Sequence, residues 1–196
     1  MKEDILEQLV DDYLQALGYF TIHNLKFRPR KEHPEFVSNQ DSNHSDIDVL
    51  GYHPNLSGPD RVMAVSCKSW QEGFGPQSMI KLLEADSNVG GRKAWKSFRE
   101  LMKPKWSEAF IAAVEKATDT QAFTYVTAVT TIKGDPKPWE TYQPFRVAMR
   151  GNPIKLLSLA EMLTLLMRSM NTTVANSQLG RTLQLLKASG CSFGVD

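Results

Sequence analysis

One segment restricts the fold of this chain more than any other, the run VMAVSCK at residues 62–68, which is nearly all apolar and ends in a lysine. A strand that is apolar on both faces is typical of the middle of a sheet covered on both sides. Residues 123–132, FTYVTAVTTI, have the strongest β-propensity in the sequence. Because helical patterns separate these two runs, the sequence predicts an α/β fold with a mixed sheet flanked by helices.

Further elements follow from local patterns. Residues 3–17 place apolar side chains on one helical face before Gly18, and residues 19–27 and 46–52 are expected strands. The other expected elements are helices at 77–88, 92–103 and 108–117 (capped by Ser107), a strand at 145–149, a helix after the capping box Ser158–Glu161, and a helix at about 176–188. We divide the chain into a core of residues 1–150 and a helical C-terminal extension of residues 151–196, packed on that core.

Composition excludes several classes of protein. Of the 196 residues, 41% are hydrophobic and 23% are charged, a balance that excludes wholesale disorder. No apolar run approaches the roughly 20 residues of a membrane helix, and the acidic start MKEDILEQLVDD does not resemble a secretory signal. Cys67 and Cys191 are too few for a disulfide framework or a thiolate zinc site. We therefore expect a cytoplasmic protein that does not bind a membrane.

Charge is concentrated in one segment. The net charge of +1 excludes a purely electrostatic nucleic-acid binder but allows a locally basic face. Residues 91–106, GRKAWKSFRELMKPKW, contain one acid, Glu100, among many cations and interleaved aromatic residues. If this segment is helical, one stripe carries four cations suited to phosphates, and a solvated helix face is the alternative. The cations expected to bind nucleic acid are Arg92, Lys93, Lys96, Arg99 and Lys103, together with Arg28 and Arg30.

An acid and a lysine mark the ends of two expected strands. Asp48 lies in SDIDVL, and Lys68 closes VMAVSCK. With the order helix, three strands, helix, strand over residues 3–132, the pattern Asp48…Ser66-x-Lys68 resembles the PD-(D/E)xK nuclease superfamily. That group includes restriction enzymes, Holliday-junction resolvases and repair nucleases. The resemblance implies a restriction-endonuclease-like core.

The resemblance also implies an activity, that of a Mg²⁺-dependent endodeoxyribonuclease (with Mn²⁺ as a substitute) of restriction, repair or defence type. Asp48 would be the main metal ligand, the Cys67 carbonyl a further ligand, Glu7 a neighbour of the metal, and Lys68 the catalytic lysine; Asp46 is the less favoured ligand. A divalent cation polarises the phosphate and lowers the pKa of the attacking water. A lysine stabilises the developing charge, or orients or deprotonates the water.

Ser66 departs from this pattern, because the superfamily has Asp or Glu two residues before the lysine. A hydroxyl is a poor Mg²⁺ ligand, so the site lacks one negative charge. Either the protein is inactive, or another carboxylate takes this place, as in restriction enzymes that carry a glutamate on the following helix. Glu84 in IKLLEADS is our candidate, with Glu72 second. A solvated surface position is the alternative for these acids and for Glu7.

Three functions remain open at this point. The first is the endonuclease, and the second is a catalytically inactive nuclease-fold protein that binds nucleic acid or a protein partner. The missing acid at position 66 discriminates between them. The third is a structural subunit, against which the basic segment argues. The expected partners are DNA, a second copy of the chain packed through the apolar C-terminal helices, and a protein of a larger complex.

Overall fold

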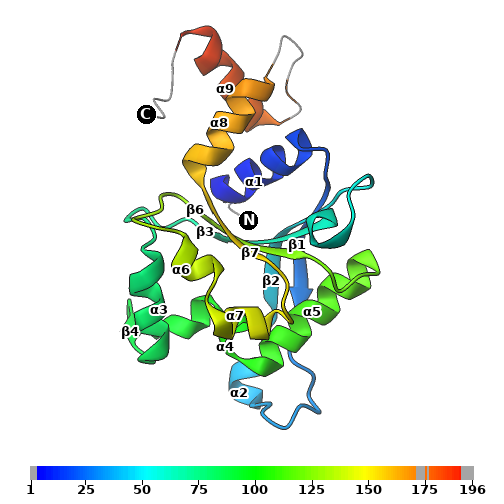
Figure 1. The fold of residues 1–196 in the computed structure, drawn as a ribbon, viewed down its shortest axis with the longest axis vertical. Helices are drawn as coiled ribbons and strands as arrows, with labels where there is room; N and C mark the ends of the chain where they lie inside the picture. The colour runs from blue at the N-terminus through cyan, green and yellow to red at the C-terminus, as the bar shows by residue number, and fades with distance from the viewer. Residues whose placement is uncertain (1–3, 171–174, 176, 191–196) are drawn as a thin grey trace.

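The computed structural model, drawn in Figure 1, describes residues 4–170, 175 and 177–190. Five strands of this part of the chain form one sheet in the order β1-β2-β3-β6-β7. β1, β2 and β3 are antiparallel neighbours, whereas β3, β6 and β7 run parallel. Their bounds are β1 Phe20–Phe27, β2 Ser45–Tyr52, β3 Val62–Lys68, β6 Thr124–Val129 and β7 Ile154–Ser158. The predicted α/β class with a mixed sheet flanked by helices is confirmed.

Helices cover both faces of the sheet, as Figure 1 shows. Above the sheet in that view lie α1 (Ile5–Ala16), α8 (Leu159–Ser169) and α9 (Gln178–Ala188). Below it lie α3 (Pro76–Glu84), α4 (Arg99–Met102), α5 (Pro104–Thr118), α6 (Lys137–Glu140) and α7 (Gln143–Ala148). The short α2 (Ser38–Asp41) belongs to the loop between β1 and β2. None of the helices described is long and apolar enough to cross a membrane.

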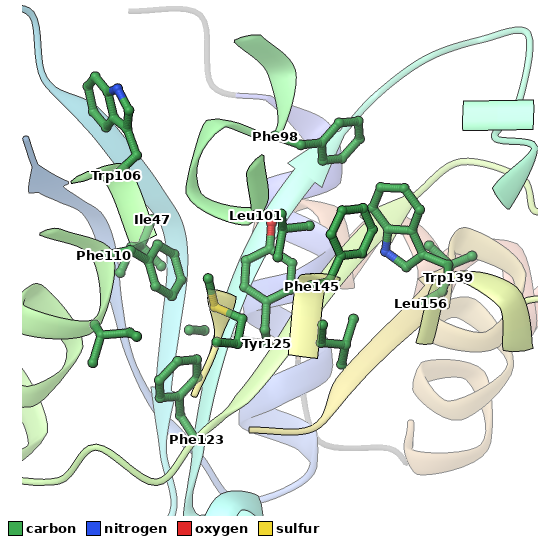
Figure 2. Close-up of a cluster of buried hydrophobic side chains, with 14 of the residues drawn as sticks. Ile47, Phe98, Leu101, Trp106, Phe110, Phe123, Tyr125, Trp139, Phe145 and Leu156 are labelled. Carbon is green, nitrogen blue, oxygen red and sulfur yellow. The ribbon is translucent and has the colours of Figure 1, made fainter. Parts of the chain in front are cut away.

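The larger hydrophobic core lies on the α5 side of the sheet, and Figure 2 shows Tyr125 in its middle. Every residue of β6 is buried, in keeping with its apolar, aromatic and β-branched sequence. A second cluster forms between the opposite face and α1, with Val10 and Leu14 fully buried. Because both faces are covered, polar groups of the central strands are accessible only where the strands end.

Three expected elements differ in the structure. Residues 92–103 do not form one helix. A short hairpin of two strands, β4 (Asn88–Val89) and β5 (Arg92–Lys93), ends inside this range. It is followed by a 3₁₀ turn, η2 (Ala94–Ser97), and then by α4. Gly90 and Gly91, with φ of 57° and 78°, form the tight turn of this hairpin. Pro104 begins α5 rather than ending a helix, because proline is well suited to a first helical position. Ser107 therefore lies inside α5, where its hydroxyl donates to the Glu100 carbonyl.

The strand expected at residues 145–149 is wrong. This segment belongs to the helix α7, which has Pro144 in its first turn and buries Phe145 in the core. The strand actually comes later, as β7, where it pairs in parallel with β6. A division at residue 150 therefore separates β7 from the sheet that it completes.

The C-terminal helices pack on α1. The predicted capping box is confirmed, since the Glu161 amide donates to the Ser158 hydroxyl and the Ser158 amide donates to the Glu161 carboxylate. Leu166 of α8 and Leu183 of α9 contact Leu9 of α1, so packing within the chain accounts for much of their apolar character. A second copy bound through these helices stays a prediction. Cys191 lies outside the described residues.

Candidate active site

The site begins where β2 and β3 diverge. The two strands are paired from Val49 to Tyr52 and from Val62 to Val65. Ile47 packs in the α5-side core while Val49 packs against α1, although residues two apart in a regular strand share a face. β2 therefore changes faces at Asp48, opposite Asn24, whose φ of 53° interrupts β1. This irregularity places Asp48 beside the end of β3.

The Asp48 carboxylate is fixed by the backbone of β3. The amide of Cys67 donates a hydrogen bond to Asp48 Oδ2 at 2.6 Å. Burial raises the Asp48 pKa, and the negative charges of Glu100 and Asp46 add to this effect. The positive charge of Lys68 and the Cys67 amide oppose it without cancelling it. A carboxylate in this situation is poised to accept additional positive charge.

Lys68 lies beside Ser66 on one face of β3. Its Nζ donates to Ser66 Oγ at 2.8 Å and lies 5.6 Å from the centre of the Phe98 ring. The ammonium group thus remains at the end of the strand, close to Asp48. The expected juxtaposition of an acid and a lysine is present in the structure.

Cys67 points to the other face and packs towards α1, as alternation along the strand predicts. Burial, followed by the negative charges of Asp48 and Glu7, raises the pKa of its thiol well above the ordinary value. The thiol is therefore protonated and acts as a small apolar side chain. Coordination of a metal by the Cys67 carbonyl stays a prediction.

Glu7 of α1 reaches the same group of charges. The Glu7 pKa is raised, and burial is the largest cause. Among the neighbouring charges, Asp48 raises this pKa most, followed by Asp4. Asp46 contributes as well; its Oδ1 is buried without a hydrogen-bond partner and lies 3.6 Å from Lys26 Nζ. The end of β2 is therefore crowded with carboxylates, which repel one another.

Glu84 is not brought into this group. Its carboxylate is exposed and accepts a hydrogen bond of 2.7 Å from the Tyr142 hydroxyl. The buried residues of α3 are Pro76, Ile80 and Leu83, whereas Glu84 is the last residue of that helix and is exposed. Glu72 is exposed in the loop between β3 and α3. The acid on the α5 side whose charge acts on Asp48 is a different one.

That acid is Glu100 of α4, which sequence reasoning missed as a site residue. It is only 6% exposed, and its Oε1 accepts a hydrogen bond of 2.6 Å from the Tyr125 hydroxyl. Its charge raises the pKa of Asp48. One feature of the sequence could have pointed to Glu100: it is the single acid among the cations of residues 91–106.

Polar side chains lie between Glu100 and the lysine. Lys68 donates to Ser66, the Ser66 side chain lowers the pKa of the neighbouring Tyr125 hydroxyl, and Tyr125 donates to Glu100. Complete burial and the neighbouring Glu100 raise the Tyr125 pKa well above its ordinary value, so this hydroxyl keeps its proton. Position 66 lacks a carboxylate, but the buried Glu100 carboxylate lies next to the Tyr125 hydroxyl, which neighbours Ser66.

The basic segment surrounds aromatic rings rather than forming a helical stripe. The cations of Lys96 and Lys103 lie 6.0 and 4.9 Å from the Trp95 ring, and that of Arg99 lies 4.6 Å from Trp106. We call Lys96, Arg99 and Lys103 the α4 cations. They adjoin or belong to the four-residue helix that carries Glu100 on its buried side.

The other predicted cations have different surroundings. Lys93 binds the Asp86 carboxylate at 2.7 Å, while Arg92 is exposed. Arg28 and Arg30 are exposed just after β1. Their contact with nucleic acid stays a prediction.

The donor set suits a lightly held cation. Within residues 4–170, 175 and 177–190, no three His, Cys, Asp or Glu side chains are arranged to hold a metal ion. Mg²⁺ is usually bound through one or two carboxylates, with water and substrate phosphate completing its shell. The repulsion of Asp48 with Glu7 and with Glu100 fits that mode of binding, because a cation would relieve it. The residues present therefore fit Mg²⁺ held together with substrate, and do not fit a closed protein cage.

Chemically, the arrangement combines carboxylates that can hold a hard cation, a lysine that can stabilise negative charge, and nearby cations suited to phosphates. Comparisons with known protein families, with curated proteins and with solved structures find no match to this chain.

Proposed function

We propose that this protein is a Mg²⁺-dependent endodeoxyribonuclease with a restriction-endonuclease-like core. One observation carries the proposal: Asp48 and Lys68 lie together at the divergence of β2 and β3, and a buried second acid, Glu100, acts electrostatically on Asp48. A buried pair of like charges costs free energy in the fold, and such groups cluster at functional sites.

Each side chain has a role in this proposal. Asp48 is the principal ligand of Mg²⁺, and Glu100 or Glu7 supplies the second negative charge. When bound, the cation polarises the scissile phosphate and lowers the pKa of water. Lys68 stabilises the charge that develops on the phosphate, and Ser66 holds its ammonium group in place.

Nucleic acid would approach over the α4 cations. Lys96 is exposed, Arg99 and Lys103 are half-buried, and all three lie against indole rings. Phosphate contacts by such groups give an affinity that falls with salt. Because α4 also carries Glu100, the same short segment would contact the backbone and complete the site.

The second candidate is a nuclease-fold protein that binds nucleic acid without cleaving it. It is favoured by the position of Glu100, whose carboxylate already accepts a hydrogen bond from Tyr125 and is almost fully buried. In this candidate, Glu100 serves only as the partner of the Tyr125 hydroxyl. DNA binding by the α4 cations would remain.

Cleavage of plasmid and oligonucleotide DNA in Mg²⁺, Mn²⁺ or EDTA tests the proposal. We expect metal-dependent cleavage that Asp48→Asn and Lys68→Met each reduce by roughly 10²–10³-fold. Asp48→Asn should not lower the unfolding temperature, because burial and like charges already disfavour the ionised form of Asp48. DNA binding without cleavage under any of these conditions supports the second candidate. Equal cleavage by both variants and the wild type would show that the site is elsewhere.

A further inference from the structure

A large cavity opens immediately after Lys68. Its volume is about 690 Å³, within the range of pockets that bind small ligands. The loop that follows β3 and the outer side of α3 form its walls, and the β4–β5 hairpin closes one side through Val89. Its apolar lining is contributed mainly by Trp70, Phe74, Met79, Leu82 and Val89.

The walls of this cavity are held by the backbone. The amide of Phe74 donates to the Thr131 carbonyl and the Lys133 amide donates to the Phe74 carbonyl, both at 2.7 Å, so the loop is joined to the chain that leaves β6. The Trp70 carbonyl accepts a hydrogen bond from the Thr130 hydroxyl. The half-buried Trp70 ring stacks on Phe74 at a centroid distance of 5.9 Å. The cavity is therefore preformed, which lowers the entropic cost of binding.

Aromatic contacts connect the cavity to the catalytic lysine of the proposed function. Trp70 packs against Phe98 with their ring centres 5.9 Å apart, and Lys68 Nζ lies 5.6 Å from that same Phe98 ring. A ligand that occupies the cavity therefore lies next to the position at which Lys68 would meet a phosphate.

The side chains that line the cavity favour an uncharged, planar ligand. No Lys, Arg or His is among the described residues that line the cavity, and Glu72 contributes a carboxylate. A phosphate group inside would be repelled by this acid and unpaired. An uncharged aromatic ring could lie against the indole of Trp70, and Gln71, Glu72 and Ser78 offer partners for its polar edge.

We propose that this cavity binds an unpaired nucleobase of a nucleic acid whose phosphate lies at Lys68. The inference rests on the proposed function, since it takes the backbone at Lys68 from that function. It goes further by assigning the substrate class: DNA with a base that is single-stranded, or displaced from its stack, next to the contacted phosphate. Proteins that bind such bases combine stacking on aromatic side chains with hydrogen bonds to the base edge.

Binding of oligonucleotides that carry 2-aminopurine tests the inference. In EDTA, where no cleavage occurs, we compare a blunt duplex with the same duplex carrying a single-stranded extension. We expect tighter binding of the extended DNA and a change in 2-aminopurine fluorescence at one position. Trp70→Ala should weaken binding of the extended DNA by roughly 5- to 100-fold, as expected for loss of one stacked base, and should weaken blunt-duplex binding much less, so that the preference for extended DNA is lost.

Two further variants guard against a folding artefact. Trp70→Phe keeps an aromatic surface and should retain most of the preference for extended DNA. Ser78→Trp fills the cavity without removing Trp70 and should abolish the preference. Phe20→Ala removes a ring that is 71% exposed on β1, away from the cavity, and serves as the matched control.

The outcomes separate this inference from the proposed function. If extended DNA is preferred and Trp70→Ala removes the preference, the cavity assignment holds even where no cleavage is found. If the enzyme cleaves DNA but Trp70→Ala and Ser78→Trp bind extended and blunt DNA like the wild type, the inference is wrong and the endonuclease stands. Absence of any binding to both DNAs overturns the inference as well.

Discussion

A buried ion pair fixes the long loop between β1 and β2, and its removal should be costly. Lys105 Nζ lies 2.6 Å from Asp41 Oδ2, with 9% and 2% of the two side chains exposed. The Asp41 carboxylate also accepts hydrogen bonds from the Val37 amide at 2.7 Å and from Trp106 Nε1 at 3.1 Å. Lys105 is thus a structural member of the basic segment rather than a contact for phosphate.

Asp41→Asn keeps the shape of the side chain and removes its charge. The Lys105 ammonium group would remain buried, and the Glu35 carbonyl, 2.8 Å away, would still accept a hydrogen bond from it. Breaking a buried ion pair from one side typically costs about 3–5 kcal/mol. We expect a loss near the lower end, about 3 kcal/mol, because the carboxamide oxygen of the variant can still accept from neighbouring donors and the Glu35 interaction persists.

Urea unfolding of the wild type, Asp41→Asn, Lys105→Met and the double variant measures this effect. The double variant should be less destabilised than the sum of the two single changes, because no unpaired charge remains. Burial alone would raise the Asp41 pKa, but the hydrogen bonds from Lys105 and Val37 outweigh it and lower that pKa. The stability difference should therefore shrink as the pH falls below the carboxyl's ordinary value of 3.8. A loss under 1 kcal/mol at neutral pH would refute the reasoning.

Two other predictions concern the surface. Replacing the α4 cations with Gln should weaken DNA binding, and the salt dependence of log K should fall by about one unit for each phosphate interaction removed. Lys155→Gln, on β7 with Asp60 as its partner, is the control, and an unchanged salt dependence in the triple variant would remove the α4 cations from the interface. Burial and the hydrogen bond to Glu84 raise the Tyr142 pKa to about 12, so the interaction stabilises the fold below pH 10 and is lost as the pH rises towards 12. Absorbance titration should show a high-pH tyrosine that disappears in Tyr142→Phe, and an identical titration of that variant would contradict the assignment.

The sheet could be predicted where the sequence alone decides burial. Residues 62–68 form β3 with the predicted bounds, because a strand covered on both faces needs a nearly continuous apolar run. The strand predicted at residues 145–149 was wrong because the apolar and branched residues there suit a buried helix as well as a strand. Short apolar runs do not distinguish the two. In residues 92–103, helical spacing of the cations was misleading, since the turn at Gly90 and Gly91 begins a hairpin.

The site was predictable only in part, for a reason of distance along the chain. Asp48 and Lys68 lie on strands that are consecutive in sequence, and antiparallel pairing brings them together. Glu100 comes from a later helix, α4, where its carboxylate accepts a hydrogen bond from Tyr125 of β6 and its charge acts on Asp48. Glu84 and Glu100 both follow β3 and both lie in helices, so sequence spacing alone could not choose between them.

The most direct test of this account compares two isosteric changes, Glu100→Gln and Glu84→Gln. The carboxamide that Glu100→Gln introduces can still accept from the Tyr125 hydroxyl, so the fold should be retained, as circular dichroism and thermal unfolding would show. We predict that Glu100→Gln weakens Mn²⁺ binding, measured by calorimetry, and reduces Mg²⁺-dependent cleavage by at least roughly 10²-fold, while Glu84→Gln behaves like the wild type. Ser66→Glu added to Glu100→Gln should restore part of the activity. Full cleavage and metal binding by Glu100→Gln would contradict the claim that this buried acid replaces the one missing at position 66.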